Sequence, residues 1–103
     1  MSTQDRIRET VTSHPVVLFM KGSPQFPMCG FSASAIQILK ASGADAPFTV
    51  DVLQDEEIRQ GIKEYANWPT IPQLYVNGEF IGGADIMREM YQSGELQTLL
   101  GAK

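Results

Sequence analysis

Cysteine is nearly absent from this sequence of 103 residues, where Cys29 is the only one. A single cysteine cannot form a disulfide within the chain, which excludes the disulfide frameworks of small secreted domains. Long apolar runs are lacking as well, because the longest, from Val16 to Met20, is far shorter than the ~20 residues that span a bilayer. The first residues lack the apolar core of a signal peptide, so we expect a cytoplasmic protein with no membrane contact.

Positive charge is also scarce. The chain has 8 lysines and arginines against 12 aspartates and glutamates, which gives a formal net charge of -4. A surface that binds nucleic acid normally needs clustered positive charge, so we expect no nucleic-acid partner. The remaining composition is that of an ordinary globular protein, with 43% hydrophobic and 19% charged residues. The length fits one domain, and we expect residues 1–103 to form it.

Hydrophobic periodicity predicts an alternation of helices and strands. Helices are predicted over residues 3–13, 31–43, 55–66, 85–91 and 95–100, and strands over residues 15–20, 48–52, 72–76 and 79–81. Asn77-Gly78, between the last two strands, is a strong signal for a two-residue hairpin. This order predicts an α/β fold with a four-stranded sheet and about five helices. The pattern leaves open whether the third strand runs parallel or antiparallel to the first.

Cys29 lies between a proline-containing loop and the start of the second predicted helix. Unpaired N–H groups and the helix dipole favour a thiolate at such a position and lower the pKa of the thiol. Lys21, just after the first strand, can add a positive charge nearby. A free cysteine is often a small core residue instead, but Pro27, Gly30 and Ser32 indicate a tight turn. We therefore interpret Cys29 as a reactive thiolate.

The position that completes a Cys-x-x-Cys motif is a serine, Ser32. A serine cannot release a mixed disulfide as a second thiol would. Cys29 must therefore finish any exchange with an external thiol, or it serves as a metal ligand.

Four separated segments together resemble one known family. They are Lys21-Gly-Ser-Pro24, Cys29-Gly-Phe-Ser32, Trp68-Pro-Thr-Ile-Pro72 and Gly82-Gly-Ala-Asp-Ile86. Their order and spacing are those of monothiol glutaredoxins, and nearly the whole chain closely resembles the single-domain bacterial members. The resemblance implies a thioredoxin fold with a mixed sheet, in which the third strand runs antiparallel to the first. It also implies a cis peptide bond before Pro72.

The resemblance further implies a glutathione site. Its residues would be Lys21, Arg59, Ile71, Pro72, Gly83, Ala84 and Asp85. The cis bond would turn the backbone of Ile71 toward Cys29, where it would pair with the backbone of glutathione. Lys21 and Arg59 would hold the glycine carboxylate of the tripeptide. Its γ-glutamyl end would meet the segment from Gly83 to Asp85, with Asp85 near the amine.

Each of these residues also has a simpler interpretation. Arg59 lies on a polar helix face, where a solvated role is common, and Asp85 could cap its helix, which contributes about 1 kcal/mol. Trp68 is interpreted as packing, and His14 as the end of the first helix. Many family members have a cysteine at the position of Ala84. The alanine leaves Cys29 without an internal disulfide partner, which excludes redox control through such a bond.

A 2Fe–2S cluster usually needs four thiolate ligands, and one chain supplies only Cys29. The resemblance implies that two chains and two glutathiones supply the set, so that the cluster bridges a homodimer. The leading hypothesis is a carrier in iron–sulfur cluster transfer or storage and iron homeostasis, with apo iron–sulfur proteins as recipients. The second is a glutathione-dependent thiol–disulfide oxidoreductase acting through Cys29, an activity at which family members with this motif are generally poor. The third is an adaptor that forms heterodimers with BolA-like proteins.

Overall fold

The structure, a computed structural model, describes residues 1–101 of the chain. Its elements in chain order are α1 (Thr3–Ser13), β1 (Val16–Met20), α2 (Gly30–Ala41), β2 (Phe48–Asp51), a short 3-10 helix η1 (Val52–Gln54), α3 (Glu56–Tyr65), β3 (Gln73–Val76), β4 (Glu79–Gly82), α4 (Ala84–Ser93) and α5 (Glu95–Leu99). The predicted order of helices and strands is confirmed. Within the described residues, no helix is long and apolar enough to cross a membrane.

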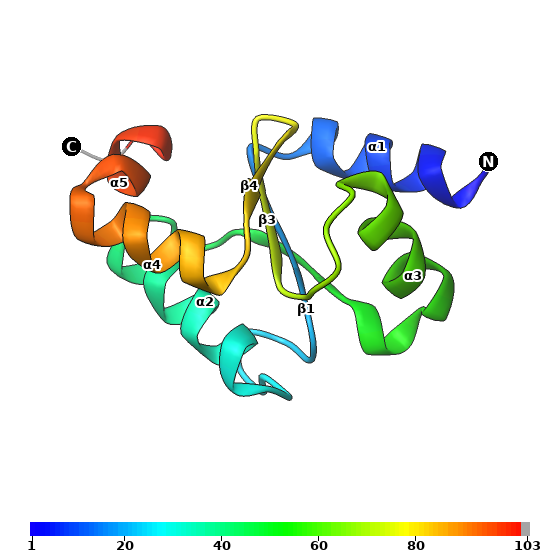
Figure 1. Ribbon diagram of the computed structural model, residues 1–103, viewed down its shortest axis with the longest axis horizontal. Helices are drawn as coiled ribbons and strands as arrows, with labels where there is room; N and C mark the ends of the chain where they lie inside the picture. Colours follow the sequence, from blue (N-terminus) through cyan, green and yellow to red (C-terminus); the bar gives the residue numbers. More distant parts are fainter. Residues whose placement is uncertain (102–103) are drawn as a thin grey trace.

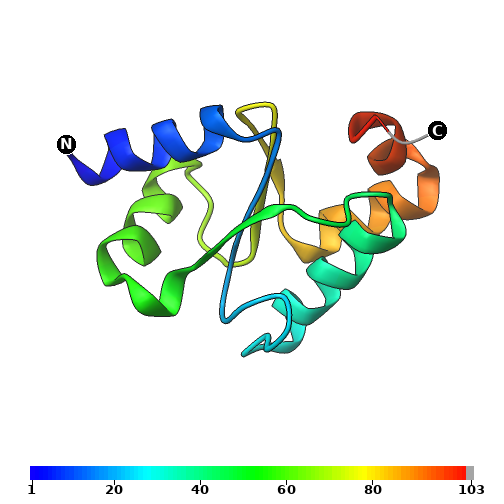
Figure 2. The ribbon, with the colours of Figure 1, turned by 180° about the vertical axis from the view of Figure 1, so that it is seen from behind.

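The four strands form one mixed sheet in the order β2-β1-β3-β4. Strand β1 pairs parallel to β2 and antiparallel to β3, and β3 pairs antiparallel to β4. The direction of the third strand, which periodicity left open, is therefore the one that the family resemblance implied. Helices α1 and α3 lie on one side of the sheet and α2 and α4 on the other (Figures 1 and 2).

The two faces of the sheet bury two separate apolar clusters. Val17 and Phe19 of β1 pack in the cluster beneath α1 and α3. Leu18 and Met20, which alternate with them, pack in the cluster beneath α2 and α4. A strand buried on both faces must be continuously apolar, which explains why β1 appears in the sequence as an uninterrupted hydrophobic run.

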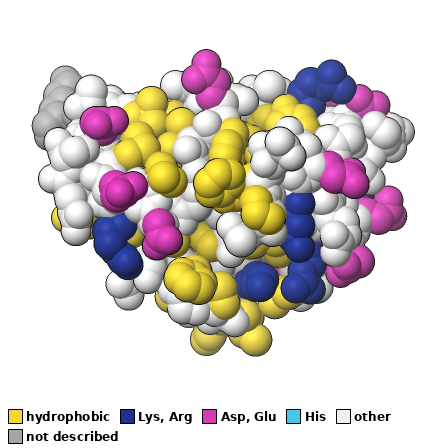
Figure 3. Space-filling view, in the orientation of Figure 1, with side chains coloured by type: hydrophobic (Ala, Val, Ile, Leu, Met, Phe, Trp, Pro, Cys, Tyr) yellow, Lys and Arg dark blue, Asp and Glu magenta, His cyan; other side chains and the backbone are white. Residues whose placement is uncertain are grey.

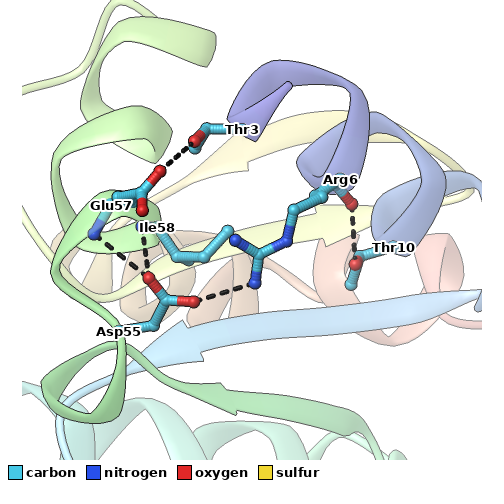
Figure 4. Close-up of polar contacts among 6 residues, drawn as sticks. All are labelled: Thr3, Arg6, Thr10, Asp55, Glu57 and Ile58. Carbon is cyan, nitrogen blue, oxygen red and sulfur yellow. Dashed lines mark hydrogen bonds and ion pairs between the residues drawn. The ribbon is translucent and has the colours of Figure 1, made fainter. Parts of the chain in front are cut away.

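Polar side chains join α1 to α3 in what we call the α1–α3 contact (Figure 4). The guanidinium of Arg6 donates to the Asp55 carboxylate at 2.8 Å, and the hydroxyl of Thr3 donates to Glu57 at 3.1 Å. The other oxygen of Asp55 accepts from the backbone N–H groups of Glu57 and Ile58. Asp55 is therefore the N-cap of α3, whereas the sequence prediction placed it inside the first turn.

Two turns show how local sequence sets the ends of strands. Val52, predicted as the end of the second strand, instead begins η1 because the Asp51 carboxylate accepts from the Leu53 N–H at 3.0 Å. The hairpin between β3 and β4 is confirmed, with φ of 52° at Asn77 and 83° at Gly78. Both residues lie in the left-handed region that such two-residue turns require.

Candidate functional site

The segment between β1 and α2, residues 21–28, folds back on itself and is called the thiol loop below. The Met28 N–H donates to the Lys21 carbonyl at 2.8 Å, so the chain returns to the end of β1 just before Cys29. Gly22 makes this reversal possible with a φ of 90°, and a Cβ there would lie 2.7 Å from the Met28 nitrogen. Glycine is the residue that fits this conformation and this space.

Cys29 is the N-cap of α2, and its sulfur accepts from the Ser32 N–H at 3.3 Å. The Ser32 Oγ lies 3.4 Å from the same sulfur and also accepts from the Lys21 N–H at 3.0 Å. In the thiol form the S–H donates to this oxygen, whereas in the thiolate form the serine O–H can donate to the sulfur. Ser32 is fully buried, and the sequence analysis did not assign it this role.

These contacts determine the acidity of Cys29. Burial is the largest single influence and by itself would raise the pKa of the thiol. The Ser32 hydroxyl, the N–H groups of Ser32 and Phe31, and the charge of Lys21 act in the opposite direction and together hold the pKa below its ordinary value. The reading of Cys29 as a thiolate at a helix start therefore has a physical basis in the structure.

A cleft of about 410 Å³ opens beside the thiol loop. It is lined by Lys21, Phe31, Arg59, Lys63, Trp68, Pro69, Thr70, Ile71, Pro72, Gly83, Ala84, Asp85 and Ile86. All seven residues that the resemblance implied for a glutathione site are among them. The structure thus gathers segments that lie far apart in the sequence along one surface, next to the N-terminal turn of α2.

The cleft is more positively charged than the rest of this acidic chain. Three of its lining residues are cationic, Lys21, Arg59 and Lys63, against one carboxylate, Asp85. Arg59 makes a long ion pair of 4.0 Å with Glu56, and its Nε has no hydrogen-bond partner within residues 1–101. Lys63 was missed at the sequence level, although its place one helical turn after Arg59 puts both on the same face of α3.

The wall of the cleft around residues 68–72 contains the confirmed cis peptide bond between Ile71 and Pro72. Gln73 holds this wall from behind, because its amide donates to the carbonyls of Trp68 and Thr70, both at 3.2 Å. The Tyr75 hydroxyl donates to the Gln73 Oε1 at 3.0 Å. Gln73 is fully buried, and sequence reasoning did not single it out.

Two aromatic residues, Tyr75 and Trp68, support this wall of the cleft. Burial raises the pKa of Tyr75 far above its usual range, with a smaller contribution from Tyr65, so the hydroxyl stays a donor to Gln73. Trp68 packs against Phe80 with ring centroids 5.5 Å apart and also lines the cleft. The packing role expected for Trp68 is present, and a position at the candidate site comes in addition.

The opposite wall is formed by the start of α4. Gly83 is its N-cap, and a Cβ at this position would lie 3.2 Å from the Pro72 carbonyl oxygen. No side chain caps α4 by a hydrogen bond, so the alternative in which Asp85 caps the helix is wrong. The Asp85 carboxylate is exposed in the first turn, which leaves it available to a ligand in the cleft.

Large apolar side chains flank Cys29 on both sides in the sequence. Phe26, Met28 and Phe31, which we call the apolar rim, are 76%, 66% and 65% exposed. In Figure 3, hydrophobic and basic side chains lie next to each other at the lower end of the molecule, where α2 begins in Figure 1. Exposed apolar side chains that gather at one end of a molecule are typical of surfaces that contact other proteins.

No group of three or more His, Cys, Asp and Glu side chains within residues 1–101 could hold a metal ion. Cys29 is the only thiol that the chain provides. Any metal cluster at this sulfur therefore needs ligands from outside the chain.

Comparison with known proteins gives consistent relatives. A family model described as Glutaredoxin matches residues 16–81. The ycf64-like monothiol glutaredoxin of Synechocystis is 62% identical over 99 residues, covering 95% of this chain and 91% of that protein. Glutaredoxin 4 of Escherichia coli is 52% identical over 99 residues, covering 96% of this chain and 85% of that protein. The solution structure of reduced poplar apo GrxS14 is 55% identical, covers 95% of this chain and 89% of that one, and has a TM-score of 0.80.

Proposed function

The chain belongs to the monothiol glutaredoxin family, and from this premise we propose that it binds glutathione and carries a 2Fe–2S cluster as a homodimer. The cluster is cargo, and the function is its transfer to apo iron–sulfur proteins or its storage within iron homeostasis. One observation carries the proposal: a lone thiol with a lowered pKa lies beside a cleft lined by cations. We place this single glutaredoxin domain, residues 1–103, in the cytoplasm.

Glutathione suits the chemistry of the cleft. The tripeptide has a carboxylate at each end and an amine beside one of them. Lys21 and Arg59 would hold the glycine carboxylate, and the unpartnered Nε of Arg59 supports a role toward an anion. Asp85 would accept from the γ-glutamyl amine, beside the backbone of Gly83 and Ala84. The backbone of Ile71, before Pro72, would pair with the cysteinyl part and bring the glutathione sulfur toward Cys29.

The ligand count supports sharing of the cluster between two chains. A 2Fe–2S cluster usually takes four thiolates, and each chain offers only Cys29. Two chains and two glutathiones complete the set. The apolar rim around the thiol would then be covered in the dimer. Glutathione ligands can leave without unfolding the protein, which suits a carrier that must release its cluster.

The test is anaerobic reconstitution with iron, sulfide and glutathione, followed by absorption spectroscopy and gel filtration. We expect cluster absorption together with a dimer, and the loss of both when glutathione is omitted. Cys29→Ser is the matched control, because it changes one atom and should abolish both signals. A wild-type chain that gives neither signal would contradict the proposal, as would a Cys29→Ser variant that keeps them.

The lowered pKa of Cys29 supports a second function, glutathione-dependent thiol–disulfide exchange. The Cys29 thiolate attacks the glutathione sulfur of a glutathionylated protein, and the protein thiol leaves. A second glutathione thiolate then attacks the mixed disulfide, which releases oxidised glutathione and regenerates Cys29. Fast turnover with a glutathione mixed disulfide, combined with failed reconstitution, would make this the main function.

A BolA-like protein is a further proposed partner, which would cover the same end of the molecule. Gel filtration of the chain with such a protein, with and without the reconstituted cluster, tests this. We expect a heterodimer that replaces the homodimer.

A further inference from the structure

Two backbone N–H groups leave the sheet at the point where the thiol loop begins. The N–H of Lys21 donates to the Ser32 Oγ at 3.0 Å, and the N–H of Gly22 donates to the Asp51 Oδ1 at 3.0 Å. Both therefore end on side chains instead of on a neighbouring strand. Ser32 is part of the thiol site already described, whereas Asp51 comes from β2, where its side chain also caps η1.

The place of Asp51 in the sheet explains this contact. Asp51 is the last residue of β2 and lies opposite Met20 in the register with β1. Beyond it the chain turns into η1, because the same Oδ1 accepts from the Leu53 N–H at 3.0 Å. The backbone of β2 thus ends just where Gly22 would need its next acceptor. The carboxylate takes that place and continues the pairing of β1 by one side-chain bond.

The position of Gly22 controls the residues on either side of it. Gly22 is buried, and its bridge to Pro27, with the bond from the Met28 N–H to the Lys21 carbonyl, ties the start of the thiol loop to its end. Lys21 precedes this point directly, and Cys29 follows Met28. A shift of Gly22 therefore moves both the ammonium group that lines the cleft and the sulfur.

We propose that Asp51 is a positioning residue for the thiol site: through Gly22 it holds Lys21 and Cys29 in the geometry that binds glutathione. It touches neither the sulfur nor the cleft. The part of this inference that concerns glutathione rests on the proposed function. The part that concerns the geometry of the thiol loop does not depend on any ligand.

The experiment compares Asp51→Ala with Asp51→Asn. Asparagine keeps an acceptor oxygen at the same place and both variants lose the charge, so the difference between them reports the hydrogen bonds that this oxygen accepts from Gly22 and Leu53. Asp45→Ala removes an exposed carboxylate that makes no side-chain hydrogen bond within residues 1–101, and controls for net charge. The readouts are the exchange rate of the Gly22 amide, the rate of Cys29 alkylation by iodoacetamide without glutathione, and the affinity for glutathione from Trp68 fluorescence.

We expect the Gly22 amide to exchange faster in Asp51→Ala than in Asp51→Asn. The alkylation rate and the glutathione affinity should each fall about fivefold relative to Asp51→Asn, as the loss of the hydrogen bond to Gly22, the one that reaches the thiol loop, implies. Asp51→Asn and Asp45→Ala should stay close to wild type.

Equal alkylation rates in Asp51→Ala and Asp51→Asn would overturn the inference and leave Asp51 a purely structural residue, even if Asp51→Ala unfolds at a lower temperature. A wild-type chain without measurable glutathione affinity would instead contradict the proposed function. The exchange and alkylation measurements would still decide the role of Asp51 in that case.

Discussion

The α1–α3 contact and the cleft differ in whether their polar groups have hydrogen-bond partners within the chain. In the contact, Arg6, Asp55, Thr3 and Glu57 find their partners within the chain. In the cleft, Arg59 and Trp68 each keep a buried nitrogen that has no partner within residues 1–101. Pairing inside the chain stabilises the fold. A buried polar group without a partner in the chain is instead available to form a hydrogen bond with an incoming ligand. The comparison predicts which substitutions change stability and which change binding.

The largest effect is expected at Gln73. It lies behind the cleft, but its polar groups have partners within the chain, as those of the α1–α3 contact do. Gln73→Leu would remove the partner of the part-buried carbonyls of Trp68 and Thr70 and leave the hydroxyl of Tyr75 buried without one. We expect the free energy of unfolding to fall by about 3 kcal/mol, measured by urea denaturation. Tyr75→Phe, which removes one of the three bonds, should cost about 1 kcal/mol. Equal losses in both variants would mean that the wall of the cleft does not depend on Gln73.

The next effect separates binding from stability. Arg59→Met keeps much of the apolar stem but removes the charge, so glutathione should bind about thirtyfold more weakly, as the loss of a charged hydrogen bond implies. The free energy of unfolding should change little, because the only ion pair of Arg59 within residues 1–101 is 4.0 Å long. Isothermal titration and urea denaturation on the same preparation check both halves. A large loss of stability with unchanged affinity would reverse the assignment of Arg59.

A smaller effect is expected at Ser32. Ser32→Ala removes the hydroxyl that stabilises the thiolate, so the pKa of Cys29 should rise and the alkylation-rate curve should move to higher pH. At a fixed pH below the pKa of Cys29, the alkylation rate of Ser32→Ala should be about fivefold lower than that of the wild type. The Cys29 sulfur keeps the backbone N–H of residue 32, so the shift should be partial. Ser32→Thr, which retains the hydroxyl, is the matched control, and an unchanged curve in Ser32→Ala would contradict the assignment.

The smallest effect is expected in the α1–α3 contact. Arg6→Ala removes an exposed ion pair, and such pairs contribute little. Arg6 lowers the pKa of Asp55, chiefly through their hydrogen bond, so the stabilisation exists at neutral pH and is lost as the pH falls through the folded-state pKa of Asp55. Thermal unfolding of both proteins should therefore differ slightly at neutral pH and converge in acid. A difference that grows in acid would contradict this.

The sequence predicted some parts of the fold and not others. Strand β1 and the hairpin at Asn77-Gly78 were predictable because burial and turn conformation restrict residue types at those positions. The antiparallel direction of β3 and the cis bond before Pro72 came only from family resemblance. Periodicity along one strand contains no information on the direction of its neighbour. The end of β2 was predicted one residue too late because Val52 continues the apolar alternation, while the turn is set by the Asp51 side chain.

The site was predictable where a residue type is unusual and unpredictable where it is ordinary. Cys29 stands out as the only thiol. Lys21 and Asp85 lie in family motifs, and Arg59 was named only through the family resemblance. Ser32, Gln73 and Asp51 act through hydrogen bonds to backbone groups, and their residue types do not by themselves predict those bonds. The sequence does not show that the Lys21 N–H, eleven positions before Ser32, will end on that hydroxyl.

The charged cleft and the apolar rim lie at the same end of the molecule, and salt acts on them in opposite directions. Added salt screens the attraction between the cations of the cleft and a small anion, so the proposed binding of glutathione would weaken. A salting-out anion such as sulfate strengthens the burial of Phe26, Met28 and Phe31 against another protein. A titration with sulfate would therefore separate the electrostatic contribution of the cleft to ligand binding from the hydrophobic contribution of the apolar rim to protein contact.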